Sequence, residues 1–273
     1  MRRDDEKAPP AEPRRQGPQR LADLMRKAMS QAREQPSAGL AQLEADWKQR
    51  EAELQQSKAA ERARQEAAHA DAWPLHLKLC HAPAEAVEAL TGHTVLETAA
   101  LRAARHVLRE GLRTLLLSGG PGVGKTAGAC HLFRSAVRHE TRTAECLPEW
   151  DASVGLFLRW SQVKRVSDSE AEDGQLLQRA VRVRVLVLDD IGGLPGEEVG
   201  PRDREFLEEM VDRRDVPGMV TAYTTRLSVP RRDAGPSDFA LHVGARVVSR
   251  MSRQGTFHLA DCGNRDLRRG GAP

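Results

Sequence analysis

A glycine-rich segment that ends in lysine and threonine is the part of the chain best suited to chemistry. Its residues, GGPGVGKT, run from Gly119 to Thr126 and fit the pattern G-x-x-x-x-G-K-[ST] of loops that cradle nucleotide phosphates. Glycines let such a loop curl until several backbone N–H groups point at phosphate oxygens. Lys125 supplies a compact charge for the β- and γ-phosphates, and the Thr126 hydroxyl is a ligand for Mg²⁺. The predicted binding residues are Gly119, Gly120, Pro121, Gly122, Val123, Gly124, Lys125 and Thr126.

Two adjacent carboxylates end an apolar run in the second half of the chain. The run Val185–Leu188 is followed directly by Asp189 and Asp190. In phosphate-loop proteins a neighbouring strand carries an acidic residue at its carboxyl end, so we predict that Asp189 holds Mg²⁺ through its water shell. Asp190 then stands where hydrolysing enzymes place a base that orients the attacking water. A cap for the following turn is the alternative role for Asp190, and both roles together are also open.

Alternating strand and helix patterns predict the elements that position these residues. A buried strand over 115–118 precedes the phosphate loop, and a helix over 125–139 follows it. Helices are also expected between residues 84 and 111. Further strands are expected over 154–160, 185–188, 218–225 and 255–261, and further helices over 161–166, 173–181, 201–215 and 238–251. Strands that alternate with helices predict an α/β fold, with a parallel sheet flanked by helices.

The N-terminal part of the chain differs in composition from the rest. Residues 1–20 are charged and proline-rich, which predicts a disordered tail. Residues 21–73 are rich in Ala, Gln, Glu and Arg, which predicts a helical and possibly coiled-coil arm. Its apolar stripe, at near-heptad spacing, consists of Leu40, Leu43, Trp47 and Leu54. Because so thin a stripe cannot bury itself, we expect a partner-binding arm before a phosphate-loop domain over 74–273. A solvated helix without a partner is the alternative.

Composition and charge restrict the class of protein. The 273 residues carry a formal net charge of +3 and are 30% charged, which is compatible with nucleic acid without requiring it. The four cysteines form no CxxC pair, so neither a disulfide framework nor a zinc ribbon is predicted. No apolar segment follows the charged N-terminus, and no run approaches the length of a membrane span. We therefore expect a cytoplasmic protein without a membrane partner.

With both motifs placed, the chain resembles the AAA+ ATPases of the DnaC/IstB type, which include bacterial helicase loaders and ATP-dependent helper proteins of transposons. The resemblance covers about 82–269. It rests on LLLSGGPGVGKT, VLVLDDIG, FLEEMVDRRDVPGMVTAYTT, and GARVVSRM with GNRDLRR behind it. It implies a P-loop AAA+-like fold and ATP with Mg²⁺ as cofactors. The implied activity is hydrolysis of ATP to ADP and phosphate, slow until subunits assemble.

The resemblance also implies further site residues. The family usually ends its next strand in Thr/Ser-Asn, which senses the γ-phosphate. Here Thr224 and Thr225 stand at the hydroxyl positions, and Arg226 stands where Asn is expected. An arginine donates hydrogen bonds but cannot accept them, so Arg226 could bind the γ-phosphate but could not orient a water as an amide does. An Arg226 that points to solvent is the alternative. Arg250 is the candidate arginine finger for a neighbouring subunit's ATP, or else an ordinary surface arginine; Arg213 and Arg214 are further candidates for that interface.

The expected partners follow from these assignments. An arginine finger that acts in trans requires a homo-oligomer that forms on ATP binding. The arm would bind a replicative helicase or a transposase. Three basic residues after the second strand, Arg159, Lys164 and Arg165, could contact DNA phosphates or form a solvated surface. The adenine pocket is placed at residues 93–96, from their position before the phosphate loop.

Several functions fit these expectations. The favoured one is a DnaC-like ATPase of DNA replication that loads or remodels a helicase. The alternative is an IstB-like ATP-dependent DNA-binding helper of transposition, and the arm decides between the two. A small-molecule P-loop kinase is a third possibility, against which the Asp-Asp strand end and the VVSRM segment count. A nucleotide-gated binding module with negligible turnover is the fourth, and Arg226 keeps it open.

Overall fold

The computed structural model describes residues 17–32, 38–138, 149–167, 174–192, 199–229 and 237–267. Most of the tail predicted over 1–20 lies outside these residues. The chain divides into two units, Met1–Arg64 and Gln65–Pro273, and the division falls within a helix. Among the described residues, no helix is both long and apolar enough to cross a membrane.

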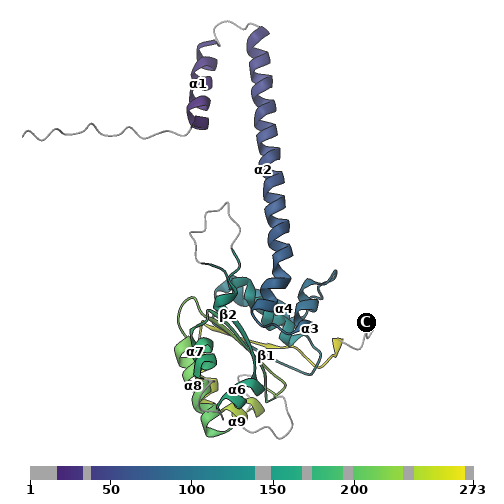
Figure 1. The fold of residues 1–273 in the computed structure, drawn as a ribbon, viewed down its shortest axis with the longest axis vertical. Helices are drawn as coiled ribbons and strands as arrows, with labels where there is room; N and C mark the ends of the chain where they lie inside the picture. The colour runs from purple at the N-terminus through teal and green to yellow at the C-terminus, as the bar shows by residue number, and fades with distance from the viewer. Residues whose placement is uncertain are drawn as a thin grey trace, which may run out of the picture. The chain divides into compact units, whose positions relative to one another are not determined.

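The first unit is helical. It contains α1 (Gly17–Ala32) and the greater part of α2 (Ala38–Leu79), which Figure 1 shows as one continuous helix. Its Ala-, Glu-, Gln- and Arg-rich sequence consists of strong helix formers. Leu43, Trp47 and Leu54 of the predicted stripe are 56%, 40% and 54% exposed, so these side chains are available for contact.

The end of α2 belongs to the second unit. Helix α2 continues through the boundary predicted between residues 73 and 74, with Pro74 inside the helix. Trp73 and Leu77 are buried in the core, as is Cys80 just after the helix. The division at Arg64 therefore precedes the predicted boundary, because the last turns of α2 pack with the sheet and its helices.

The second unit is built around a five-stranded sheet of order β2-β3-β4-β1-β5. Every strand pairing is parallel. The strands are β1 (Thr114–Ser118), β2 (Gly155–Arg159), β3 (Val185–Ile191), β4 (Val220–Thr225) and β5 (Phe257–Asp261). Their near-continuous apolar runs suit a parallel sheet that is covered on both faces.

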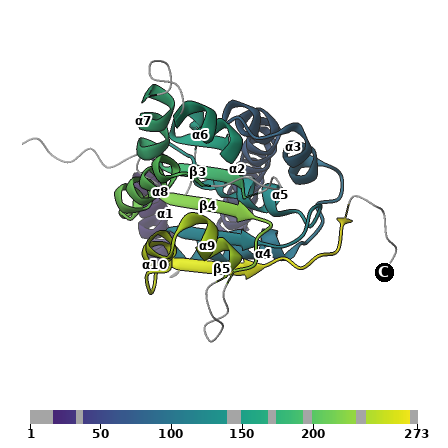
Figure 2. The same ribbon diagram turned by 90° about the horizontal axis from the view of Figure 1, so that it is seen from below.

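Helices cover both faces of this sheet (Figure 2). One face carries the end of α2, α3 (Ala84–Thr91), α4 (Ala99–Glu110), α5 (Lys125–Cys130) and the 3₁₀ helix η1 (His131–Ser135). The other carries α6 (Trp160–Ser167), α7 (Gly174–Arg182), α8 (Pro201–Arg214), α9 (Asp238–Val243) and α10 (Ala245–Met251). A short 3₁₀ turn, η2 (Ala152–Val154), precedes β2. The predicted fold class is confirmed: a phosphate-loop α/β fold with a parallel sheet between helices and an N-terminal helical arm.

Three elements differ from their predicted extent by a break or by more than two residues at one end. The helix predicted over 125–139 is α-helical only to Cys130 and continues as η1. The helix predicted over 238–251 is broken at Gly244, whose φ of 100° is outside the helical region and favours glycine. The strand predicted over 185–188 extends through Ile191, so both aspartates lie within β3 rather than after it.

Candidate functional site

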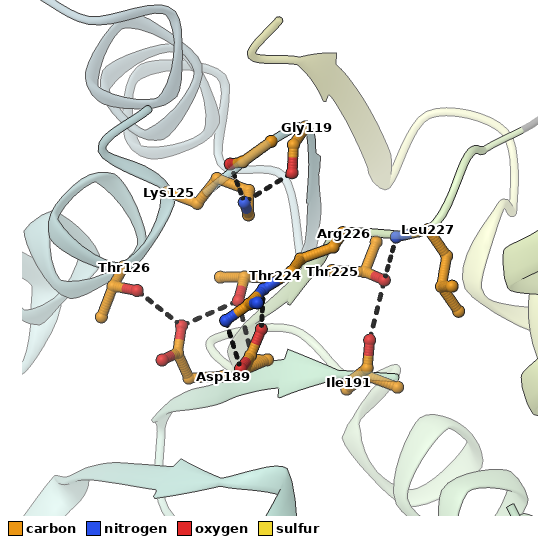
Figure 3. A network of polar contacts seen from close by, with 11 residues as sticks. Gly119, Lys125, Thr126, Asp189, Ile191, Thr224, Thr225, Arg226 and Leu227 are labelled. Carbon is orange, nitrogen blue, oxygen red and sulfur yellow. Dashed lines mark hydrogen bonds and ion pairs between the residues drawn. The ribbon is translucent and has the colours of Figure 1, made fainter. Parts of the chain in front are cut away.

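A cavity of about 590 Å³ lies where β1, β3 and β4 end and α5 begins. Binding at the carboxyl ends of parallel strands is the general rule for open α/β sheets. The cavity wall comes from the phosphate loop, the ends of β2, β3 and β4, the α3–α4 region and one residue near the C-terminus. Figure 3 shows its polar contacts from close by.

The phosphate loop folds around the side chain of its own lysine. Lys125 is 8% exposed, and its ammonium donates to the carbonyl oxygens of Gly119 and Gly120, each at 2.7 Å (Figure 3). Burial lowers the pKa of Lys125, and nearby groups including Asp190 and Asp189 oppose that shift. Of the predicted loop residues, Pro121 to Thr126 line the cavity. Gly119 and Gly120 are not among the lining residues, and they hold Lys125 instead.

Asp189 is the centre of a cluster of oxygen atoms. Its Oδ1 accepts hydrogen bonds from the hydroxyls of Thr126, at 2.9 Å, and Thr224, at 2.7 Å. Burial raises the pKa of the Asp189 carboxyl, and these two hydrogen bonds oppose the shift. A carboxylate beside the phosphate-loop hydroxyl is a donor set that suits Mg²⁺, which is usually held by one or two carboxylates together with phosphates. The residues therefore fit the predicted cation.

A β-bulge brings both aspartates to the same site. The register between β3 and β4 shifts between Leu188 and Ile191, so that the two aspartates lie opposite Thr224 alone. The Thr224 hydroxyl accepts from the backbone N–H of Asp190 at 2.9 Å while it donates to Asp189. Asp190 has φ of 64°, a left-handed conformation that aspartate tolerates better than most residues. Bulges commonly re-aim side chains next to active sites, and this one turns Asp190 towards the cavity.

Arg226 closes over Asp190. Its Nε and Nη2 donate to Oδ1 and Oδ2 of Asp190 at 3.1 and 3.2 Å, which is the bidentate geometry of a guanidinium–carboxylate pair. The two side chains are 47% and 37% exposed. Arg226 is thus partly exposed and paired with Asp190, and its contact with the γ-phosphate stays a prediction. The turn that Asp190 was alternatively predicted to cap, residues 191–193, ends outside the described residues, so the capping role stays a prediction.

The opposite end of the cavity is largely apolar. Thr94, Val95 and Leu96 line it, and His93 of the predicted adenine pocket does not. Sequence reasoning missed the lining residues from this region, which are Pro83, Glu85, Ala86, Ala89 and Leu90 around α3, Thr98 just before α4, and Leu101 of α4. Only the general helical pattern marked this region, because nothing local indicates which face of α3 meets the phosphate loop.

The segment after β5, residues 262–267, lies along the phosphate loop, and we name it the C-terminal strap. The N–H of Gly120 donates to the Gly263 carbonyl at 2.8 Å, and the N–H of Leu267 donates to the Gly122 carbonyl at 3.0 Å. A Cβ atom at Gly122 would lie 1.8 Å from Oδ1 of Asp266. The strap also contributes Leu267 to the cavity wall, a role that the sequence did not predict.

The arginines proposed for a subunit interface have different surroundings. Arg250 is 25% exposed and forms an ion pair with Asp212 of α8, and it does not line the cavity of its own chain. Arg213 is exposed and pairs with Glu209 at 2.8 Å. A role for Arg250 towards a neighbouring subunit stays a prediction.

The prediction that Arg214 lies at a subunit interface is wrong. It is 3% exposed, and its guanidinium donates to the Thr221 hydroxyl at 2.7 Å and to the Val183 carbonyl at 2.5 Å. It also donates to the carbonyls of Ala180, Val181, Arg184 and Val220. Burial lowers its pKa to about 10. Arg214 therefore joins α7, α8 and the starts of β3 and β4 within one chain and cannot reach a neighbour.

The predicted DNA-contact residues differ in their surroundings where the structure describes them. Arg159 lines the cavity, and Lys164 is half-buried on α6. The side chain of Arg165 lies outside the described part of the chain. The helicase loader or transposon-helper roles for this region remain predictions.

Comparison with known proteins gives a family match and several structural likenesses. The model of the family described as IstB-like ATP binding protein matches residues 20–231. No curated protein matches the chain. The crystal structure of the DnaC helicase loader is similar with TM-score 0.42 at 24% identity, over 60% of this chain and 88% of that one. For the crystal structure of DnaI the values are 0.45, 18%, 66% and 93%, and for C. elegans PCH-2 they are 0.34, 14%, 61% and 40%.

Proposed function

The chain belongs to the family of IstB-like ATP-binding proteins, and from that premise we propose that it hydrolyses ATP and uses the reaction to switch its binding to a DNA-processing partner. One observation carries the proposal. The phosphate loop, the Thr126–Asp189–Thr224 oxygen cluster and the Asp190–Arg226 pair all meet in a single cavity. A phosphate-binding loop alone would support binding, whereas a carboxylate pair beside it supports hydrolysis.

The residues divide the chemistry among them. The backbone N–H groups of the loop and Lys125 would hold the phosphates, with Lys125 exchanging its two carbonyl partners for phosphate oxygens. Thr126 and Asp189 would hold Mg²⁺, which neutralises charge on the β- and γ-phosphates when it is bound. Asp190 would orient the attacking water, and Thr224 and Arg226 would contact the γ-phosphate.

Two ion pairs support a low rate of ATP hydrolysis for the isolated chain. Asp190 is held by Arg226, and Arg250 is held by Asp212. Both pairs must open before Asp190 can orient a water and Arg250 can reach a neighbouring subunit's nucleotide. We therefore propose that ATP promotes a homo-oligomer in which turnover is faster, and that hydrolysis loosens the subunit contact.

The proposed hydrolysis is tested by steady-state phosphate release and by ATP affinity. We expect slow turnover by the wild type. Asp190→Asn should lose most of its turnover and keep its ATP affinity, and Lys125→Ala should lose ATP binding. Lys78→Ala, at an exposed position on α2, is the matched control and should behave as wild type. Normal turnover by Asp190→Asn would show that Asp190 is not the base, and unchanged ATP affinity in Lys125→Ala would remove the proposal.

The finer proposal is that the protein loads or remodels a replicative helicase in DNA replication. The exposed stripe of Leu43, Trp47 and Leu54 supports an arm that is available to such a partner. The second candidate is a DNA-binding helper of transposition. The family match, which runs from residue 20 through the arm, is compatible with both candidates.

A binding comparison separates the two. The full chain would be mixed with replicative helicase, and separately with duplex DNA and transposase, in the presence of ATP or ADP. Helicase capture that is lost when Leu43 and Trp47 are changed to Ser supports the loader. ATP-dependent duplex binding without helicase capture supports the transposition helper. A phosphorylated small molecule in place of free phosphate would identify a kinase, and nucleotide-gated binding without turnover would identify a binding module.

A further inference from the structure

Arg159 lines the cavity without a role in the function proposed above. It is the last residue of β2 and pairs in register with Asp189 of the neighbouring strand. Residues two positions apart on a strand share a face, and Phe157, Val187 and Ala222 all lie in the core beneath α4 and α5. Arg159, Asp189 and Thr224 therefore leave the sheet on the phosphate-loop face. Arg159 borders the same cavity as Lys125 and Asp190.

Three basic side chains line this cavity in the described part of the chain, and their bonding differs. Lys125 is held by two carbonyl oxygens, and Arg226 is held by both oxygens of Asp190. Arg159 uses its backbone N–H, which donates to Oε1 of Gln162 at 2.8 Å. Its guanidinium makes no hydrogen bond or ion pair with any described residue. Arg159 lines the cavity and is exposed, so its donors are available to a ligand.

We propose that Arg159 binds the terminal phosphate of ATP in this cavity, an inference that rests on the proposed ATPase function. The order β2-β3-β4 puts Arg159, at the end of β2, and Arg226, directly after β4, on either side of the two aspartates of β3. A terminal phosphate above Asp189 and Asp190 then lies between two arginines of the same chain. A guanidinium matches phosphate oxygens with a planar fork of donors. This assignment replaces the predicted contact between Arg159 and DNA.

The distinguishing measurement is the affinity of the full chain for ATP against its affinity for ADP. Arg159→Met keeps the length of the side chain and removes its charge, and Arg159→Lys keeps the charge without the fork. We expect Arg159→Met to raise the Kd for ATP about tenfold, from the loss of a charged hydrogen bond, and to leave the Kd for ADP within about twofold of wild type. Arg159→Lys should fall between the two. Arg182→Met, at an exposed position on α7, is the control and should match wild type for both nucleotides.

The outcomes separate this inference from the proposed function. A wild-type chain that binds neither nucleotide would contradict the ATPase itself. A wild type that binds ATP, with Arg159→Met binding ATP equally well, contradicts only the role of Arg159. Equal loss of ATP and ADP affinity also overturns it, because ADP lacks the γ-phosphate. Loss of duplex DNA binding at saturating ATP, with ATP affinity intact, would return Arg159 to the DNA surface and reject the inference.

Discussion

At the scale of single residues, backbone conformation explains why an aspartate follows Asp189. Asp190 occupies a left-handed position in the bulge of β3, which short polar side chains tolerate better than long ones. Its carboxylate is then within reach of the Arg226 fork. The ion pair between Asp190 and Arg226 therefore depends on the left-handed backbone at position 190.

We predict that glutamate at position 190 destabilises the protein. Asp190→Glu should lower the free energy of unfolding by about 1 kcal/mol, because a longer side chain is less compatible with a left-handed backbone. Asp190→Asn keeps the backbone preference and loses only an exposed ion pair, so it should cost no more than about 0.5 kcal/mol. Urea denaturation of the three proteins measures the difference. A glutamate variant as stable as wild type would show that the conformation at position 190 is not restrictive.

At the scale of elements, the C-terminal strap explains glycines that phosphate binding does not require. The motif leaves positions 120 and 122 free to be any residue. In this chain Gly120 donates to the strap, and a side chain at Gly122 would collide with Asp266. The strap therefore joins β5 to the phosphate loop. A movement of the loop on nucleotide binding would displace the strap and the end of β5.

A double-mutant cycle tests the contact between the loop and the strap. Gly122→Ala should destabilise by about 2 kcal/mol, mainly from its φ of 73° and in part because the Asp266 carboxylate must move. Adding Asp266→Ala should recover the part due to the collision, which gives a favourable coupling of about 1 kcal/mol or more. Gly111→Ala is the matched control, since Gly111 has φ of 65° with nothing near its Cβ position, and it should cost about 1 kcal/mol for the backbone alone. Additive effects of the Gly122 and Asp266 changes would contradict the contact.

At the scale of the whole molecule, buried histidines make stability depend on pH. Burial, followed by the charges of Arg134 and Arg105, lowers the pKa of His131 to about 4 from its ordinary value of 6.5. Burial also lowers the pKa of His76. Between the two His131 values the unfolded chain takes up a proton that the folded chain does not. The free energy of unfolding therefore rises with pH through this window. The contribution of His131 to stability is lost as the pH falls from 6.5 towards 4.

We expect this loss to reach about 3 kcal/mol for His131, from its shift at about 1.4 kcal/mol per pKa unit. Chemical denaturation between pH 7 and pH 4 measures it. His131→Gln should flatten the pH dependence, and His93→Gln, at an exposed position, should leave it unchanged. A His131→Gln protein with the wild-type pH dependence would assign the acid sensitivity to other groups.

Much of the architecture was predictable because its signals are local. The phosphate loop is a contiguous pattern, and apolar runs with helical or alternating periodicity mark the strands and most of the helices. The positions of Lys125, Thr126 and Asp189 around one cavity follow from that pattern, since the carboxyl ends of neighbouring parallel strands meet at one edge of the sheet. Gly244 was the local signal that would have divided the helix predicted over 238–251.

The sequence by itself determined the phosphate loop, the acidic strand end and the α/β class, because contiguous residues and their spacing specify each of them. Only the tertiary structure decided the partner of Arg226, the burial of Arg214 and the contact of the strap with Gly122. Those features depend on contacts between residues far apart in the chain, and on a bulge that changes which way Asp190 points. A periodic pattern carries no information about such contacts, because they exist only after the strands have been ordered in the sheet.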